Sequence, residues 1–96
     1  MPVARLKAPA EVRNLIRHIP PVLKRKVRAA VADILDDPSC GKALKEELEG
    51  YWSLRVGRSR IVYRLTASES EIVTIGPRES VYEEAAREIH RGQVKR

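Results

Sequence analysis

The sequence predicts an α+β domain in which two N-terminal helices lie on one face of a small antiparallel sheet of about four strands, followed by a C-terminal helix. Apolar and polar residues alternate over 51–65, as in paired strands, while apolar residues recur at helical spacing over 9–37. A chain of 96 residues buries one modest core, so we expect a single domain over residues 1–96. The expected order is β-α-α-β-β-β-α.

The N-terminal part is predicted to form a short strand at 3–7 and then two helices. The first helix starts after Pro9, and Pro20-Pro21 ends it and begins the second, which Pro38 closes. Their buried stripes comprise Val12, Leu15, Ile16 and Ile19, then Leu23, Val27, Ala30, Val31, Ile34 and Leu35. Four basic residues crowd the start of the second helix, against its dipole, so helix stability does not explain them: Lys24, Arg25, Lys26 and Arg28.

The stretch "YWSLRVGRSRIVYRL" is predicted to form a hairpin with a tight turn after Val56. A loop with an even number of residues places Leu54 on the same face as Ile61, whereas an odd loop would bury arginines. Three arginines then share the outer face: Arg55, Arg60 and Arg64. Like charges on facing strands cost about 0.2–1 kcal/mol per pair. An anionic ligand on this face and a solvated edge explain the cluster equally well.

The C-terminal part is predicted to contain a fourth strand at 71–75, a Gly-Pro turn and a helix that ends near Gly92. Ser80 and Glu83 have the spacing of a capping box at the helix start. The apolar stripe of this helix comprises Tyr82, Ala85, Ala86 and Ile89. We expect the sheet face opposite the two N-terminal helices to stay open.

The composition favours an anionic partner such as nucleic acid, a membrane surface or an acidic protein, because the net charge is +6 and the pI is near 9.9. Cys40 is the only cysteine, which excludes an intramolecular disulfide and a thiolate metal cluster. His18 and His90 have no third ligand nearby in sequence, so we expect neither a metal nor another cofactor. The chain has no signal-peptide or membrane-spanning pattern, and we expect a cytoplasmic protein.

Three segments resemble the RelE/ParE superfamily of toxins from type II toxin–antitoxin systems: "IPPVLKRKVRAAVADILDDP", "ALKEELEGYWSLRVGRSRIVYRL" and "IGPRESVYEEA". The resemblance covers nearly the whole chain, and the three segments occur in the order that is typical of the superfamily. The resemblance implies a ribosome-dependent endoribonuclease that cleaves messenger RNA and inhibits translation. It also implies a cognate antitoxin with an acidic, largely disordered segment that covers the basic face.

The resemblance to the nucleases of this superfamily implies four catalytic residues: Arg55, Arg60, Arg78 and Tyr82. Guanidiniums stabilise the dianionic transition state of cleavage through the 2′-hydroxyl, and a phenol flanked by cations can accept that hydroxyl's proton or stack on a base. Eight residues are candidates for contacts with RNA: Lys24, Arg25, Lys26, Arg28, Tyr51, Ser53, Arg58 and Arg64. Tyr51 is the stacking candidate, and the basic helix start is suited to ribosomal RNA or is simply solvated.

The sequence leaves other interpretations open. The best-studied nuclease pattern has a second lysine where this chain has Ser53. This difference favours a non-catalytic ParE-like toxin that binds and poisons DNA gyrase. A plain nucleic-acid-binding module is a third possibility. Tyr82 also fits a core position, and Arg78 fits a turn residue paired with Glu79 or Glu83.

Overall fold

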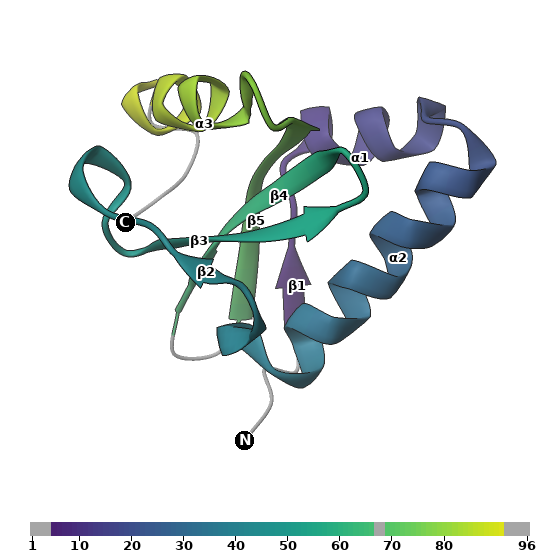
Figure 1. Cartoon of the computed structure of the whole chain (residues 1–96), viewed down its shortest axis with the longest axis horizontal. Coiled ribbons are helices and arrows are strands. Elements are labelled where there is room, and N and C mark those ends of the chain that lie inside the picture. The colour runs from purple at the N-terminus through teal and green to yellow at the C-terminus, as the bar shows by residue number, and fades with distance from the viewer. Residues whose placement is uncertain (1–4, 67–68, 92–96) are drawn as a thin grey trace.

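Five strands form one sheet in the order β1-β5-β4-β3-β2, with helices on both faces (Figure 1). The computed structural model describes residues 5–66 and 69–91. The helices are α1 (Ala10–His18), α2 (Pro21–Asp36) and α3 (Val81–His90), with single 3₁₀ turns η1 (Pro38–Cys40) and η2 (Glu46–Leu48). The strands are β1 (Arg5–Lys7), β2 (Lys42–Ala43), β3 (Tyr51–Val56), β4 (Ser59–Leu65) and β5 (Glu69–Pro77).

The predicted fold class and element order are confirmed, with one added strand and one parallel pairing in the otherwise antiparallel sheet. The two-residue strand β2, which the sequence did not indicate, pairs with β3. Strand β1 pairs with β5 in parallel, so the sheet is antiparallel except at this edge. Residues 3–4 of the predicted first strand and the tail from Gly92 lie outside the described residues. Among the described residues, no helix combines the length and apolar character needed to cross a bilayer.

The β3–β4 hairpin has the predicted even register. Gly57 and Arg58 alone form the turn, so Leu54 lies opposite Ile61 and Arg55 lies opposite Arg60. Gly57 adopts a left-handed conformation with φ of 61°, which glycine tolerates best. The apolar side chains therefore face α2, and the arginines face the other side of the sheet.

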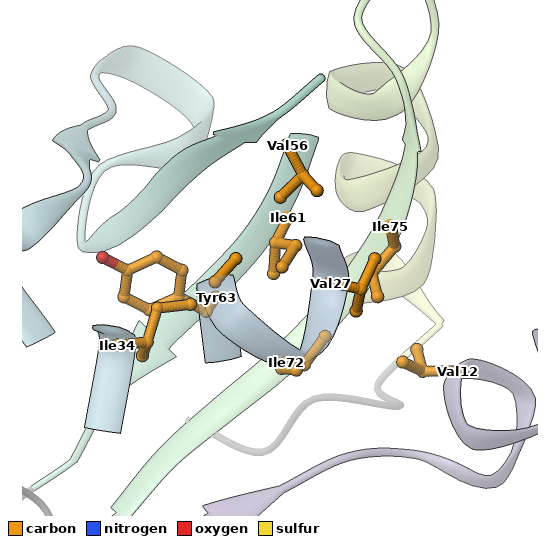
Figure 2. Close-up of a cluster of buried hydrophobic side chains, with 9 residues drawn as sticks. Val12, Val27, Ile34, Val56, Ile61, Tyr63, Ile72 and Ile75 are labelled. Atoms are coloured by element: carbon orange, nitrogen blue, oxygen red, sulfur yellow. The ribbon is translucent and has the colours of Figure 1, made fainter. Parts of the chain in front are cut away.

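The larger core lies between the sheet and the two N-terminal helices. Figure 2 shows Val12 from α1 and Val27 and Ile34 from α2 pointing toward side chains of the sheet. The sheet contributes Val56, Ile61, Tyr63, Ile72 and Ile75. Leu15, predicted for the stripe of α1, is instead 41% exposed.

The opposite sheet face is not open, contrary to the expectation from the sequence. Helix α3 packs Val81 and Ala85 against Val62 and Val73, which point away from the larger core. These valines make part of this face apolar, and covering it removes that area from water. Ser80 is the N-cap of α3, but its side chain makes no capping hydrogen bond, so the predicted capping box is absent.

A buried tyrosine joins the sheet to the segment after α2. The hydroxyl of Tyr63 donates to the carbonyl oxygen of Pro38 at 2.7 Å and accepts from the N–H of Gly41 at 3.2 Å. A Cβ atom at position 41 would lie 2.5 Å from the Tyr63 hydroxyl oxygen and 2.7 Å from the Ser53 carbonyl oxygen, so only glycine fits there. These contacts hold β2 against β3.

The alkaline stability of the protein should depend on Tyr63. Burial, with a smaller contribution from Cys40, raises the pKa of Tyr63 from 10.0 to about 12. Between these values the unfolded chain has lost the proton that the folded chain retains, so the free energy of unfolding falls by up to about 1.4 kcal/mol per pH unit. We expect Tyr63→Phe to cost roughly 1–2 kcal/mol at pH 8, because its partners lose hydrogen bonds.

Urea unfolding at several pH values measures this difference. The difference in the free energy of unfolding between wild type and Tyr63→Phe should be largest below pH 10.0 and should decrease as the pH rises toward about 12. A gap that stays constant across this range would show that Tyr63 titrates alike in the folded and unfolded states.

Candidate nucleic-acid interface

Four arginines line one small pocket at the turn end of the β3–β4 hairpin. The pocket measures about 190 Å³ and is lined by Arg55, Gly57, Arg58, Ser59, Arg60, Arg78 and Glu79. Its single carboxylate belongs to Glu79, so the lining is strongly positive. A volume of this size suits a compact anion such as a phosphate group, and arginine donates to phosphate oxygens in a planar fork.

Backbone contacts bring these arginines together. Arg55 and Arg60 are cross-strand partners on one face. Arg78 lies in the turn before α3, and its N–H donates to the carbonyl oxygen of Arg58 at 3.3 Å, which ties this turn to the hairpin. The Nε of Arg55 donates to the carbonyl oxygen of Gly57 at 3.2 Å and holds the guanidinium over the turn.

A chain of hydrogen bonds leads from this pocket to α3. The Nη1 of Arg60 donates to the Oγ of Ser53 at 2.9 Å, and this Oγ lies 3.1 Å from the Tyr82 hydroxyl oxygen. Tyr82 is half-buried and lines a second groove of about 380 Å³ with Lys42, Ala43, Leu44, Lys45 and Leu48. The sequence allowed a core or a site role for Tyr82. In the structure its side chain packs against the core beneath α3, and its hydroxyl reaches Ser53 in the candidate site.

The sequence matches a known family over most of its length. A family model described as the ParE toxin of the type II toxin–antitoxin system parDE matches residues 5–82. This chain belongs to that family. It is thus a type II toxin of the RelE/ParE superfamily, which confirms the resemblance seen in the sequence. A search of curated proteins finds no match.

Solved structures share the fold of this family member. The RelBE2 toxin–antitoxin complex from Mycobacterium tuberculosis matches with 27% identity and a TM-score of 0.69, over 81% of this chain and 93% of that one. A mutant of the E. coli toxin RelE in the free state has 20% identity and a TM-score of 0.73, over 93% and 99% of the two chains. The YoeB–YefM complex from Staphylococcus aureus has 18% identity and a TM-score of 0.63, over 74% and 92%.

The basic start of α2 lies partly beside the arginine pocket of this toxin. The Nζ of Lys26 is 3.9 Å from the position that a Cβ atom would take at Gly57, so this amine adjoins the hairpin turn. The Nζ of Lys24 instead donates to the carbonyl oxygen of Arg17 at 3.1 Å, near the end of α1. Arg25 and Arg28 are exposed.

Three predicted RNA contacts need correction. Tyr51 is only 8% exposed and packs in the core beneath α3, so its ring is not available for stacking on a base. Arg64 pairs with the buried carboxylate of Glu71 at 2.9 Å, which neutralises its charge. Ser53 is 1% exposed, so its hydroxyl reaches Arg60 and Tyr82 rather than a ligand.

The structure also adds two lysines that the sequence analysis did not name, and it gives Glu79 a place in the site. Lys42 and Lys45 line the groove beside Tyr82, and their position depends on the pairing of β2 with β3. Glu79 faces the arginine pocket, but in the described part of the chain neither it nor Glu83 forms an ion pair with Arg78. The sequence signal for Glu79 was its position directly after Arg78, a candidate site residue.

Over residues 5–66 and 69–91, no three His, Cys, Asp or Glu side chains gather closely enough to hold a metal ion. Partial burial and the nearby carboxylates of Asp33 and Asp37 raise the pKa of the Cys40 thiol, which makes it a poor nucleophile at neutral pH.

The arginine pocket should bind a small polyanion. We expect inorganic pyrophosphate to shift the NMR signals of the pocket arginine side chains, and Arg60→Ala to weaken its binding by about 10-fold, the usual scale for one charge-assisted hydrogen bond. Arg87→Ala is the matched control, because Arg87 lies on α3 outside the pocket lining and makes an exposed pair with Glu84. Equal weakening by both substitutions would mean that pyrophosphate responds only to net charge.

Proposed function

We propose that this toxin is an endoribonuclease that cleaves messenger RNA on the ribosome and thereby inhibits translation. The observation that carries this proposal is the pocket lined by Arg55, Arg58, Arg60 and Arg78, with Glu79 as the acidic residue of its lining. Such a lining favours a phosphate group, and favours it more as negative charge builds up in the reaction.

The proposed reaction is attack of a 2′-hydroxyl on the adjacent phosphorus. The bond between phosphorus and the 5′-oxygen breaks, and this oxygen takes up a proton from water, which leaves a 2′,3′-cyclic phosphate and a free 5′-hydroxyl. Arg55 and Arg60 are assigned to the non-bridging oxygens, which carry two negative charges in the transition state. Arg78 is assigned to charge developing on the leaving 5′-oxygen, because an arginine remains protonated and stabilises charge better than it transfers a proton.

Two groups of the site can accept the proton of the attacking 2′-hydroxyl. Tyr82 is linked to Arg60 through Ser53, and Glu79 lines the arginine pocket directly. The groove that joins Tyr82 to Lys42 and Lys45 suits the adjoining nucleotide, with an aromatic ring for its base and amines for its phosphate. Substitution of Tyr82 and of Glu79, one at a time, distinguishes which of the two accepts the proton.

The ribosome and an antitoxin are the proposed partners, in the cytoplasm. Lys26 extends the basic surface from the pocket onto α2, where Arg25 and Arg28 are exposed, and this surface suits ribosomal RNA. Two of the similar solved structures, RelBE2 and the RelB–RelE complex from Methanococcus jannaschii, are described as toxin–antitoxin complexes. A partner with an acidic segment would complement the arginine pocket and would block access to it.

Poisoning of DNA gyrase is the second candidate. The matching family model is described as a ParE toxin, and this chain has buried Ser53 where the nuclease pattern noted above has a lysine. Under this alternative the arginine pocket would contact a protein or DNA without cleaving RNA.

Mapping of messenger-RNA 5′ ends after induction in bacterial cells tests the proposal. We expect cuts in phase with the codons of translated frames, and a decrease of ~10²-fold with Arg60→Ala or Arg78→Ala, the scale for loss of one charge-stabilising group. Glu79→Gln and Tyr82→Phe identify the proton acceptor by which of them lowers cleavage more. Arg87→Ala should cleave like the wild type.

The outcomes separate the two candidates. Growth arrest with intact messages and broken chromosomal DNA would reject the nuclease and support the gyrase target. Cleavage that persists in both arginine variants would reject the assigned pocket. A loss of cleavage supports the pocket only where the variant melts at the wild-type temperature.

A further inference from the structure

Ser53 lies at the centre of the candidate site but cannot touch a ligand. It is the third residue of β3 and is 1% exposed. Its Oγ lies 2.9 Å from the Nη1 of Arg60 and 3.1 Å from the hydroxyl oxygen of Tyr82. Any effect of Ser53 on a bound ligand must therefore pass through these two side chains.

The inventory of donors and acceptors fixes the direction of the bond from Arg60 to Ser53 and favours one direction for the bond between Ser53 and Tyr82. A guanidinium can only donate, so the Ser53 oxygen accepts from Arg60. If Tyr82 also donated to this oxygen, the proton of Ser53 would have no acceptor among the described residues, at a position closed to water. The satisfied arrangement is therefore Arg60 donating to Ser53 and Ser53 donating to Tyr82.

This direction determines what Tyr82 presents to a ligand. Its oxygen accepts from Ser53 on the buried side, so its other hydrogen-bonding position lies on the side of the groove lined by Lys42 and Lys45, where a phenol donates and a phenolate accepts. Because Arg60 donates into the same serine, its guanidinium and the phenol are held in a fixed relation. Hydrogen bonds in such a chain polarise and strengthen one another.

We infer that Ser53 is a positioning residue that holds Arg60 and Tyr82 together as one unit and directs the Tyr82 hydroxyl toward the substrate. This inference rests on the proposed endoribonuclease function for its catalytic consequence. The hydrogen-bond chain itself is a property of the folded protein and can be tested without a substrate.

The test is a double-mutant cycle with Ser53→Ala and Tyr82→Phe, read as single-turnover cleavage of messenger RNA on purified ribosomes. We expect Ser53→Ala to slow cleavage by about 10-fold, the equivalent of one lost hydrogen bond. The double variant should lose less than the product of the two single losses, because both substitutions break the same chain. Ser53→Thr, which keeps the hydroxyl, should restore most of the rate.

Ser70→Ala is the matched control. Ser70 is also a fully buried serine of this sheet, but its hydroxyl has no hydrogen-bond partner among residues 5–66 and 69–91. It should cleave at the wild-type rate, which separates the loss of a positioned hydroxyl from the general effect of a serine-to-alanine change in the sheet.

The same cycle is measured by urea unfolding without RNA, where the two substitutions should shift the midpoint by less in combination than the sum of their separate shifts. Wild-type cleavage rates in Ser53→Ala, or rate losses that multiply, would overturn the positioning role. Additive unfolding shifts would overturn the hydrogen-bond chain. An inactive wild type would reject the proposed nuclease and the catalytic part of the inference together. The unfolding cycle would still show whether the hydrogen-bond chain from Arg60 through Ser53 to Tyr82 exists.

Discussion

The register of the β3–β4 hairpin is the constraint on which the core and the candidate site both depend. With only Gly57 and Arg58 in the turn, Leu54 lies opposite Ile61 and Arg55 opposite Arg60. A turn one residue longer or shorter would exchange the two faces of one strand relative to the other. Arginines would then enter the core beneath α2, and Arg55 and Arg60 could not line the same pocket. The same two residues of turn therefore serve packing and charge placement.

The sequence was sufficient for this part of the molecule because the pattern is local. Alternation of apolar residues over 51–65 required an even turn, and that requirement alone placed Arg55 and Arg60 together. The helices at the N-terminus were likewise bounded by prolines at 20, 21 and 38. The resemblance to the RelE/ParE superfamily added Arg78 and Tyr82, which hydrogen bonds connect to the hairpin.

Positions that depend on β5 and α3 could not be predicted in the same way. A bulge shifts the pairing of β4 with β5 between Val62, opposite Thr74, and Tyr63, opposite Ile72. The extra residue on β5 places Glu71 opposite Arg64, where continued pairing would have placed Ile72. No alternation in the segment 71–75 indicates such a bulge. The neutralised charge of Arg64 was therefore not visible in the sequence.

Burial separates the arginines of this sheet face into two kinds. Arg64 and Glu71 are 15% and 4% exposed at the side chain, near the covered part of the sheet, where an unpaired charge would carry a large desolvation cost. Arg55 and Arg58 are exposed at the hairpin turn, where water stabilises an unpaired guanidinium.

Coverage by α3 therefore explains the location of the positive pocket. The helix begins at Val81, three residues after Arg78, and leaves the turn end of the hairpin accessible. The cross-strand pair of Arg55 and Arg60 still costs about 0.2–1 kcal/mol through repulsion. An anion in the pocket would remove that repulsion, so binding is favoured both by the contacts it makes and by the strain between like charges that it relieves.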